Sequence, residues 1–307
     1  MGEERQLLSV PMGNRGMRQS EAVFNHVRNL PGLMEKLTGR IAARGQPAMV
    51  AASARPRPVE GSYMPVFQVG SGLGLSLAAA LGIECFSTTH QEGHLEAGLY
   101  SAEGPRSDRF LAVHLSGGTT EILQVDKRAT GFEIRILGGS LDLHAGQLVD
   151  RVGVLMGLPF PAGPALDEMA EKAGEDFPRL ASSVSGYDFS FSGAETQAER
   201  WLSSGVEPSK VARAVEACLA NTLEKVIRRA VEENGGSDVL IVGGVAANRY
   251  LRSRLRTRLE HPAVGARLYF AQPALSSDNA VGTALLGLKK YRRQSEMGES
   301  LNDGQVD

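Results

Sequence analysis

The chain has 307 residues, of which 42% are hydrophobic and 22% are charged, and its formal net charge is -2. This composition is that of a globular protein and excludes a disordered chain, and the small net charge excludes a global basic field, so a nucleic-acid partner would need a local patch. The length predicts two lobes, which we place at 1–108 and 109–293, followed by a disordered tail over 294–307.

Short apolar runs alternate with helical patterns, and many of the 36 glycines stand between them, which predicts an α/β protein. The first predicted elements are a strand over 7–10, a helix over 17–37, a strand over 48–53, a helix over 72–81, a strand over 83–87 and a helix from Thr89. Strands over 110–115, 121–125 and 132–137 predict an antiparallel meander that opens the second lobe. Helices over 145–156, 164–172, 194–202 and 209–233, a strand over 239–242, a helix over 246–259, a strand over 267–271 and a helix over 278–291 follow.

The two cysteines, Cys85 and Cys218, lie in apolar stretches, which excludes a disulfide framework and favours a reducing compartment. The first residues lack the basic start and apolar run of a signal peptide, and no window reaches the length of a membrane span. We therefore expect a cytoplasmic protein with no membrane partner.

The segment His90-Gln-Glu-Gly-His94 places two imidazoles one helical turn apart, which is the spacing that a single metal ion needs. Thr89 is expected to cap this helix. A zincin is disfavoured, because Glu92 follows the first histidine by two positions and not by one. Two histidines four apart by chance on an exposed helix remain the alternative.

A metal would need a third ligand, and Asp278 in the segment Ser276-Ser-Asp-Asn279 is one place for it. Two imidazoles and a carboxylate suit iron or zinc. The alternative for Asp278 is a plain helix N-cap.

Three glycine segments are candidate phosphate loops. Ser116-Gly-Gly-Thr119 is either an anion-binding loop or a hairpin turn, and Gly243-Gly244 joins a buried strand to a helix, as in many phosphate sites and in many short turns. We interpret Gly70-Ser-Gly-Leu-Gly74 as close packing of a helix against a strand.

Two charged features also have alternatives. Asp150 could hold a ribose hydroxyl or pair with Arg151 on a solvated face. The arginines Arg249, Arg252 and Arg256 could touch a phosphate backbone or form the outer face of a leucine stripe.

Seven motifs occur in one order, and together they resemble the TsaD family, formerly called glycoprotease or Gcp, over about 60–290. They are His90-Gln-Glu-Gly-His94, Leu115-Ser-Gly-Gly118, Ala145-Gly-Gln-Leu-Val-Asp150, Pro159-Phe-Pro-Ala-Gly-Pro164, Asp188-Phe-Ser-Phe-Ser-Gly193, Gly243-Gly-Val-Ala-Ala-Asn-Arg249 and Ser277-Asp-Asn279.

The resemblance implies a two-lobed ASKHA fold (actin, sugar kinase and heat-shock chaperone superfamily) with a nucleotide cleft between the lobes. It implies one divalent metal, iron rather than zinc, held by His90, His94 and Asp278. The residues implied to bind ATP or threonylcarbamoyl-AMP are His114, Leu115, Ser116, Gly117, Gly118, Asp150, Gly163, Gly243, Gly244 and Asn248. The implied reaction moves a threonylcarbamoyl group to the exocyclic amine of adenosine 37 in tRNA.

The implied partners are tRNA, bound through a local basic patch, and TsaB-like and TsaE-like proteins or a second copy of the chain at the N-terminal lobe. The chain departs from the family pattern at Thr119, Gln147 and Glu195, and it is expected to start beyond the family's first strand hairpin, as a divergent, shorter paralogue. The alternatives are therefore a catalytically impaired nucleotide-binding scaffold subunit and, more remotely, a metalloendopeptidase.

Overall fold

The computed structural model describes residues 2–11, 13–14, 16–41 and 45–302. Its α-helices are α1 (Gln19–Ile41), α2 (Pro65–Leu81), α3 (His90–Ala102), α4 (Ala145–Leu155), α5 (Gly163–Ala170), α6 (Ser192–Ser203), α7 (Pro208–Asn234), α8 (Arg249–Leu259), α9 (Pro273–Ser276) and α10 (Val281–Asn302). Its strands are β1 (Met49–Arg55), β2 (Glu84–Thr89), β3 (Arg109–Leu115), β4 (Thr120–Arg128), β5 (Gly131–Gly139), β6 (Ser183–Ser185), β7 (Asp188–Ser190), β8 (Asp238–Val242) and β9 (Arg267–Phe270). Short 3-10 turns cover Glu171–Ala173 and Gly244–Ala247.

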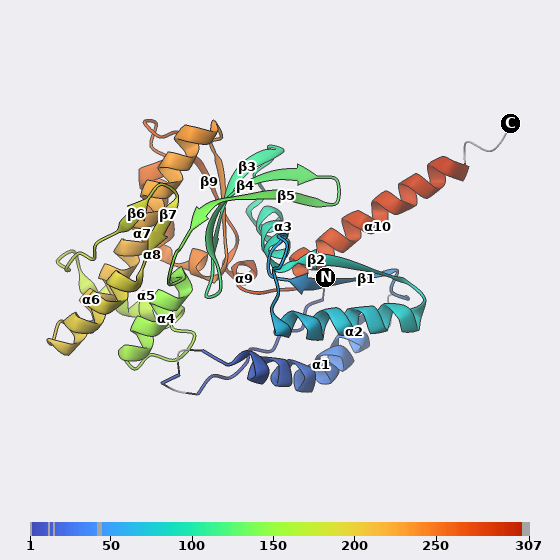
Figure 1. Cartoon of the computed structure of the whole chain (residues 1–307), viewed down its shortest axis with the longest axis horizontal. Coiled ribbons are helices and arrows are strands. Elements are labelled where there is room, and N and C mark those ends of the chain that lie inside the picture. Colours follow the sequence, from blue (N-terminus) through green and yellow to red (C-terminus); the bar gives the residue numbers. More distant parts are fainter. Residues whose placement is uncertain (1, 12, 15, 42–44, 303–307) are drawn as a thin grey trace.

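The N-terminal part is a parallel pair of strands, β1 and β2, with helices on both faces. Gly74 of α2 lies against Ala52 of β1, while Gly287 of α10 lies against Ala51, and consecutive strand residues point to opposite faces. The close packing expected of the 70–74 segment is thus confirmed at Gly74. The helix α1 packs on the outer side of α2 (Figure 1).

A five-stranded mixed sheet with the order β5-β4-β3-β8-β9 forms the second part. The strands β3, β4 and β5 make the predicted antiparallel meander, and β3 runs parallel to β8, with Leu111 opposite Val239 and His114 opposite Val242. Alternate residues of β3 belong to two different cores, one on each face of this sheet.

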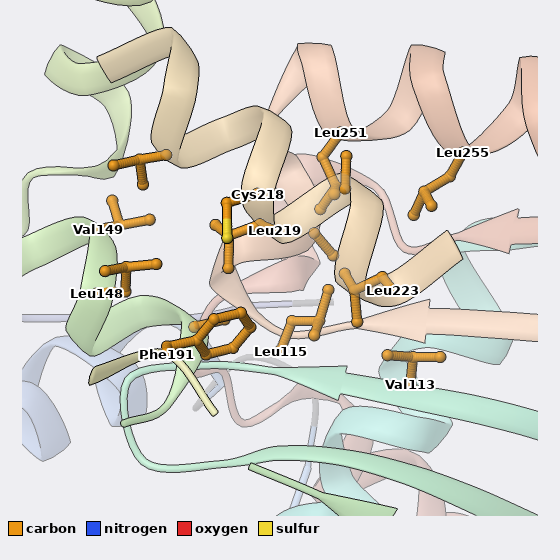
Figure 2. Packing of buried hydrophobic residues seen from close by; sticks show 14 of the residues in the cluster. Val113, Leu115, Leu148, Val149, Phe191, Cys218, Leu219, Leu223, Leu251 and Leu255 are labelled. Atoms are coloured by element: carbon orange, nitrogen blue, oxygen red, sulfur yellow. The ribbon is translucent and has the colours of Figure 1, made fainter. Parts of the chain in front are cut away.

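The larger core lies between this sheet and the helices α4, α7 and α8. Figure 2 shows Val113 and Leu115 of β3 facing Leu219 and Leu223 of α7, with leucines of α8 behind them. Burying each such side chain contributes about 1.5–3 kcal/mol. On the other face of the sheet, α3 packs Leu95 among Phe110 and Ala112 of β3 and Leu240 and Val242 of β8.

Several predicted elements need correction. The segment 7–10 forms no strand, and Leu7 is 77% exposed. The second helix begins at Pro65 and not at 72, because proline is well placed at the first helical position. The hairpin of β6 and β7 was not expected, since three-residue strands give too little alternation to detect.

The end of the chain also differs from expectation. The final helix packs against β1 and α3, which belong to the N-terminal part. It continues past Arg293 to Asn302, so the disorder predicted from 294 is wrong up to this residue. The side chain of Gln294 donates a hydrogen bond of 2.6 Å to Glu84 at the start of β2, which ties this stretch to the sheet. The rest of the predicted tail, 303–307, lies outside the described residues.

Within the described residues, no helix combines the length and the apolar character needed to cross a bilayer.

Candidate metal centre and strand-end loops

Helix α3 begins at His90 because two reciprocal hydrogen bonds between Thr89 and Glu92 cap its N-terminus. The Thr89 hydroxyl accepts a hydrogen bond from the Glu92 amide at 3.2 Å, and a Glu92 carboxylate oxygen accepts one from the Thr89 amide at 2.9 Å. This capping box fixes the first turn. It also confirms the predicted cap at Thr89. Because the Glu92 carboxylate is engaged in this box, it does not take the place that the general base has beside the metal of a zincin.

The three predicted metal ligands come together at this end of α3. His94 Nε2 lies 3.2 Å from His90 Nε2 and 3.2 Å from Asp278 Oδ1, and the remaining distance, from His90 Nε2 to Asp278 Oδ1, is 3.5 Å. Donor atoms that share one first-row metal at ~2.1 Å, with tetrahedral or octahedral angles, lie about 3.0–3.4 Å apart. The donor triangle therefore fits one iron or zinc ion.

The ligand triangle depends on close contact between two helices. Gly282 of α10 lies so close to α3 that an added Cβ would overlap the Gly93 carbonyl oxygen. Asn279 Oδ1 accepts hydrogen bonds from the amides of Val281 and Gly282, so α10 begins at Val281 and not at Asp278 as predicted. Asp278 is left in the turn before the helix, with its carboxylate toward the histidines and its side chain 81% exposed. The helix-cap alternative thus applies to Asn279 and not to Asp278.

The local electrostatics favour the protonation states that a metal requires. Burial and the neighbouring His94 lower the pKa of His90 to about 4. Desolvation raises the pKa of Asp278, but the hydrogen bond with His94 and the fields of the histidines outweigh it and hold this pKa well below its usual range. A neutral imidazole beside an ionised carboxylate is the form that binds a divalent ion.

The predicted loop residues 114–118 and 243–244 lie at the carboxyl ends of β3 and β8. From β3 the chain continues to β4 on one side of the sheet, and from β8 it continues to β9 on the other. Parallel strands with such diverging connections form a topological switch point, where α/β proteins usually bind ligands. The adjoining Gly243 has a φ of 95°, and an added Cβ would overlap the carbonyl oxygen of Leu115. The loops 115–118 and 243–244 are therefore in contact.

The turn of Ser116 is closed by its own hydrogen bonds. The Ser116 hydroxyl accepts from the amides of Gly118 and Thr119, at 3.3 Å and 3.0 Å, and the Ser116 amide donates to the Thr119 carbonyl. The segment thus forms a closed hairpin turn in which the amides of Gly118 and Thr119 are engaged by the Ser116 hydroxyl, and anion binding by this loop stays a prediction. The N-terminus of α4 lies against the same turn, because Gly146 donates to the Ser116 carbonyl at 3.1 Å. A helix N-terminus at this place favours negative charge.

Asp150 of α4 lies beside the start of α5, next to Gly163. The carboxylate of Asp150 accepts a hydrogen bond of 2.7 Å from the Ala162 amide, and burial raises its pKa. The alternative pairing with Arg151 is not formed, since this guanidinium bonds to Glu195 instead.

Asn248 belongs to a polar network that the sequence did not reveal. Its side-chain amide donates to Asp167 at 3.1 Å and to Glu216 at 2.6 Å, while its oxygen caps α8 by accepting from Leu251. Glu216 is fully buried, and burial together with the neighbouring Asp167 raises its pKa to about 8, although Arg213 opposes this shift. Of these two carboxylates, Asp167 is the more accessible to a ligand. It lies four residues after Gly163 on the same face of α5, and this spacing in the sequence could have indicated it as a site residue.

The arginines of α8 are paired within the protein. Arg249 forms ion pairs with Asp167 and Glu171, Arg252 donates to the backbone carbonyl of Ala271, and Arg256 pairs with Glu260. The leucine stripe predicted beneath them is confirmed, since all three of its leucines are buried.

Comparison with known proteins supports this reading of the fold and the motifs. The family model described as "TsaD: tRNA N6-adenosine threonylcarbamoyltransferase" matches residues 10–285. The crystal structure of full-length HypF in its phosphate- and nucleotide-bound form is similar with a TM-score of 0.60 and 14% identity, over 85% of this chain and 41% of that chain. A crystal structure of T. kodakarensis HypF gives a TM-score of 0.57 and 16% identity, over 73% of this chain and 39% of that one. The chain thus spans about two fifths of the HypF proteins, and at this identity the likeness shows the ASKHA-like fold alone. Because the family model covers most of its length, the chain belongs to the TsaD family.

Proposed function

We propose that the chain is a metal-dependent transferase that moves a threonylcarbamoyl group from threonylcarbamoyl-AMP to the exocyclic amine of adenosine 37 in tRNA. The family match supports a transferase that acts on tRNA adenosine. The observation that carries the proposal for this chain is the triangle of His90, His94 and Asp278, with donor atoms 3.2–3.5 Å apart next to the loops of the strand switch point.

The groups of the proposed metal centre have distinct roles. The two histidines and Asp278 hold one divalent ion, for which we propose iron. When bound, this ion supplies a Lewis acid that polarises the acyl carbonyl of the donor. Three protein ligands leave positions open for an exogenous ligand. The exposed side of Asp278 is where such a ligand would approach.

The strand-end loops and the acidic groups bind the adenylate. Gly243 and Gly244 bring the backbone close to the phosphate, and the N-terminus of α4 favours the negative charge of the phosphate. The carboxylate of Asp150 accepts a hydrogen bond from a ribose hydroxyl. The side-chain amide of Asn248 donates hydrogen bonds to both Asp167 and Glu216. These bonds hold the Asn248 side chain in place before the substrate binds. Catalysis would then depend on positioning and on electrostatic stabilisation of the leaving phosphate.

Partners and location complete the proposal. Exposed apolar side chains on α1 and α2, among them Phe24 at 63%, Val27 at 56% and Leu75 at 54% exposure, support docking of a TsaB-like protein or of a second copy at the N-terminal part, with a TsaE-like protein joining the complex. The free cysteines Cys85 and Cys218 support a cytoplasmic location. Binding of tRNA would use arginines of α8 that can exchange their carboxylate partners for phosphates.

The test is the transfer reaction itself. The metal-loaded protein is incubated with threonylcarbamoyl-AMP and unmodified tRNA, with and without TsaB-like and TsaE-like proteins, and nucleosides are analysed by mass spectrometry. We expect threonylcarbamoyladenosine from the wild type and none from Asp278→Ala. Product from neither protein under either condition would refute the transferase and leave the scaffold alternative.

A further inference from the structure

His114 at the end of β3 lies against the metal ligands, although the sequence groups it with the nucleotide loop. Residues of β3 alternate between the faces of the sheet, and Phe110 and Ala112 belong to the core under α3. By this alternation the His114 side chain also faces α3. Its ring centre is 4.7 Å from that of His94 and 6.2 Å from that of His90.

Two buried polar groups meet at this contact, and each lacks a partner. His114 is 1% exposed, and neither of its ring nitrogens has a hydrogen-bond partner among the described residues. The Nδ1 atom of His94 is equally buried and is also without a partner in the described part of the chain. Buried polar atoms are nearly always paired, so each unpaired group calls for an explanation.

The chemistry of metal ligation fixes the proton on His94. Its Nε2 atom points at His90 and Asp278, so Nε2 is the atom that binds the metal. A neutral imidazole that ligates through Nε2 carries its proton on Nδ1 and must donate it. Metal-bound histidines almost always donate this second N–H to an acceptor that orients the ring.

We propose that His114 is the acceptor for His94 Nδ1–H and thereby positions His94 on the metal. The inference rests on the metal site proposed above. A hydrogen bond needs the two nitrogens about 3 Å apart. The ring centres are 4.7 Å apart and the planes are tilted by 48°, so the proposed bond requires a rotation of the His114 ring toward His94 Nδ1. His114 is a positioning residue: it acts through His94 and does not bind the metal itself.

Other polar groups near this contact have different roles. The carboxylate of Glu121 is paired with Arg57 at 2.9 Å and accepts from Gln91 at 2.8 Å, and Glu92 caps α3. The carboxylates of Glu121 and Glu92 are thus engaged, whereas His114 is in ring contact with His94 and its nitrogens are unpaired among the described residues.

The test measures metal binding. Co²⁺ affinity and the visible spectrum are recorded for the wild type, His114→Leu, His114→Gln and, as a matched control on the same face of β3, Phe110→Leu. Loss of a ligand's orienting partner typically weakens metal binding about 10- to 100-fold. We expect this loss in His114→Leu with an unchanged pattern of absorption bands, a partial rescue in His114→Gln, whose amide oxygen can accept, and no loss in Phe110→Leu.

A tautomer measurement gives a second readout. In the Zn²⁺-loaded protein, nitrogen-15 NMR should show a protonated Nδ1 on His94, with a deshielded proton that loses its deshielding in His114→Leu. Equal affinities of wild type and His114→Leu would overturn the inference, as would a changed band pattern that signals a lost direct ligand. Failure of the wild type to bind Co²⁺ would refute the metal site as well, whereas normal Co²⁺ binding with no effect at His114 would refute only the role of this residue.

Discussion

The contact between α3 and α10 sets the position of Asp278, so filling it should weaken both the fold and the metal site. In Gly282→Ala the new methyl group would overlap the Gly93 carbonyl oxygen and would lie 2.9 Å from the Ala97 amide nitrogen. Overpacking costs about 1–3 kcal/mol. The obstacle here is backbone, which cannot rotate away, so the cost should be at the upper end.

The net effect follows from two opposing terms. Replacing glycine by alanine in a helix gains at most about 1 kcal/mol, which leaves a loss of about 2 kcal/mol. For a chain of 307 residues we expect Tm to fall by about 3 °C. Because α10 must move away from α3, Asp278 moves with it, and Co²⁺ affinity should fall about tenfold or more, since ligand distances tolerate only about 0.2 Å.

Gly193 is a matched control. It is the second residue of α6, as Gly282 is of α10, and an added Cβ there has no neighbour within 4 Å. Thermal unfolding of Gly193→Ala should show no loss and a gain of at most about 1 kcal/mol, and its Co²⁺ titration should match the wild type. If Gly282→Ala behaves like this control in both assays, the close helix contact does not position Asp278 and the reasoning fails.

Three further substitutions test the energetics. The pKa of Glu216 is raised to about 8, so this side chain keeps its proton in the folded protein at pH values where it loses the proton in the unfolded chain. The free energy of unfolding should therefore fall as pH rises from 5 to 8. In urea unfolding, Glu216→Gln should show a weaker fall. Burial raises the pKa of Asp142, but hydrogen bonds from Ser192, Phe191 and Leu143 outweigh it and lower this pKa to about 2. Its stabilisation is present above the ordinary pKa and is lost as pH falls through 2, so Asp142→Asn should be less stable by about 1–2 kcal/mol at pH 7, and this difference should shrink in acid. Leu223→Ala, in the core of Figure 2, should lose about 3 kcal/mol in urea unfolding, and a loss below 1 kcal/mol would contradict the packing described.

The sequence was most informative where a local signal has a local consequence. The spacing of His90 and His94 placed both on one face of α3, and Thr89 was expected as its cap because threonine is a favoured N-cap residue. The buried strand 239–242 and the glycines after it were correctly placed, since an apolar run followed by glycine has few other structures.

Features that depend on contacts between distant segments were not predictable. The return of α10 to β1 brings Asp278 to α3. From the residues alone, Asp278 was one possible third ligand with a helix cap as its alternative, and only the resemblance implied the full set of three ligands. His114 was assigned by its place in the Leu-Ser-Gly-Gly segment, because a single sequence does not say which face of β3 lies under α3. Asp167 and Glu216 were missed for the same reason, as their network joins α5, α7 and α8.

In the proposed enzyme, the metal and the adenylate are bound in one working site. The most direct measurement is calorimetric titration of a stable threonylcarbamoyl-adenylate analogue into the metal-loaded wild type and into a His90→Ala, Asp278→Ala double variant. We expect tight binding by the wild type and a large loss in the variant. No binding by the wild type, or equal binding by both proteins, would contradict this proposal.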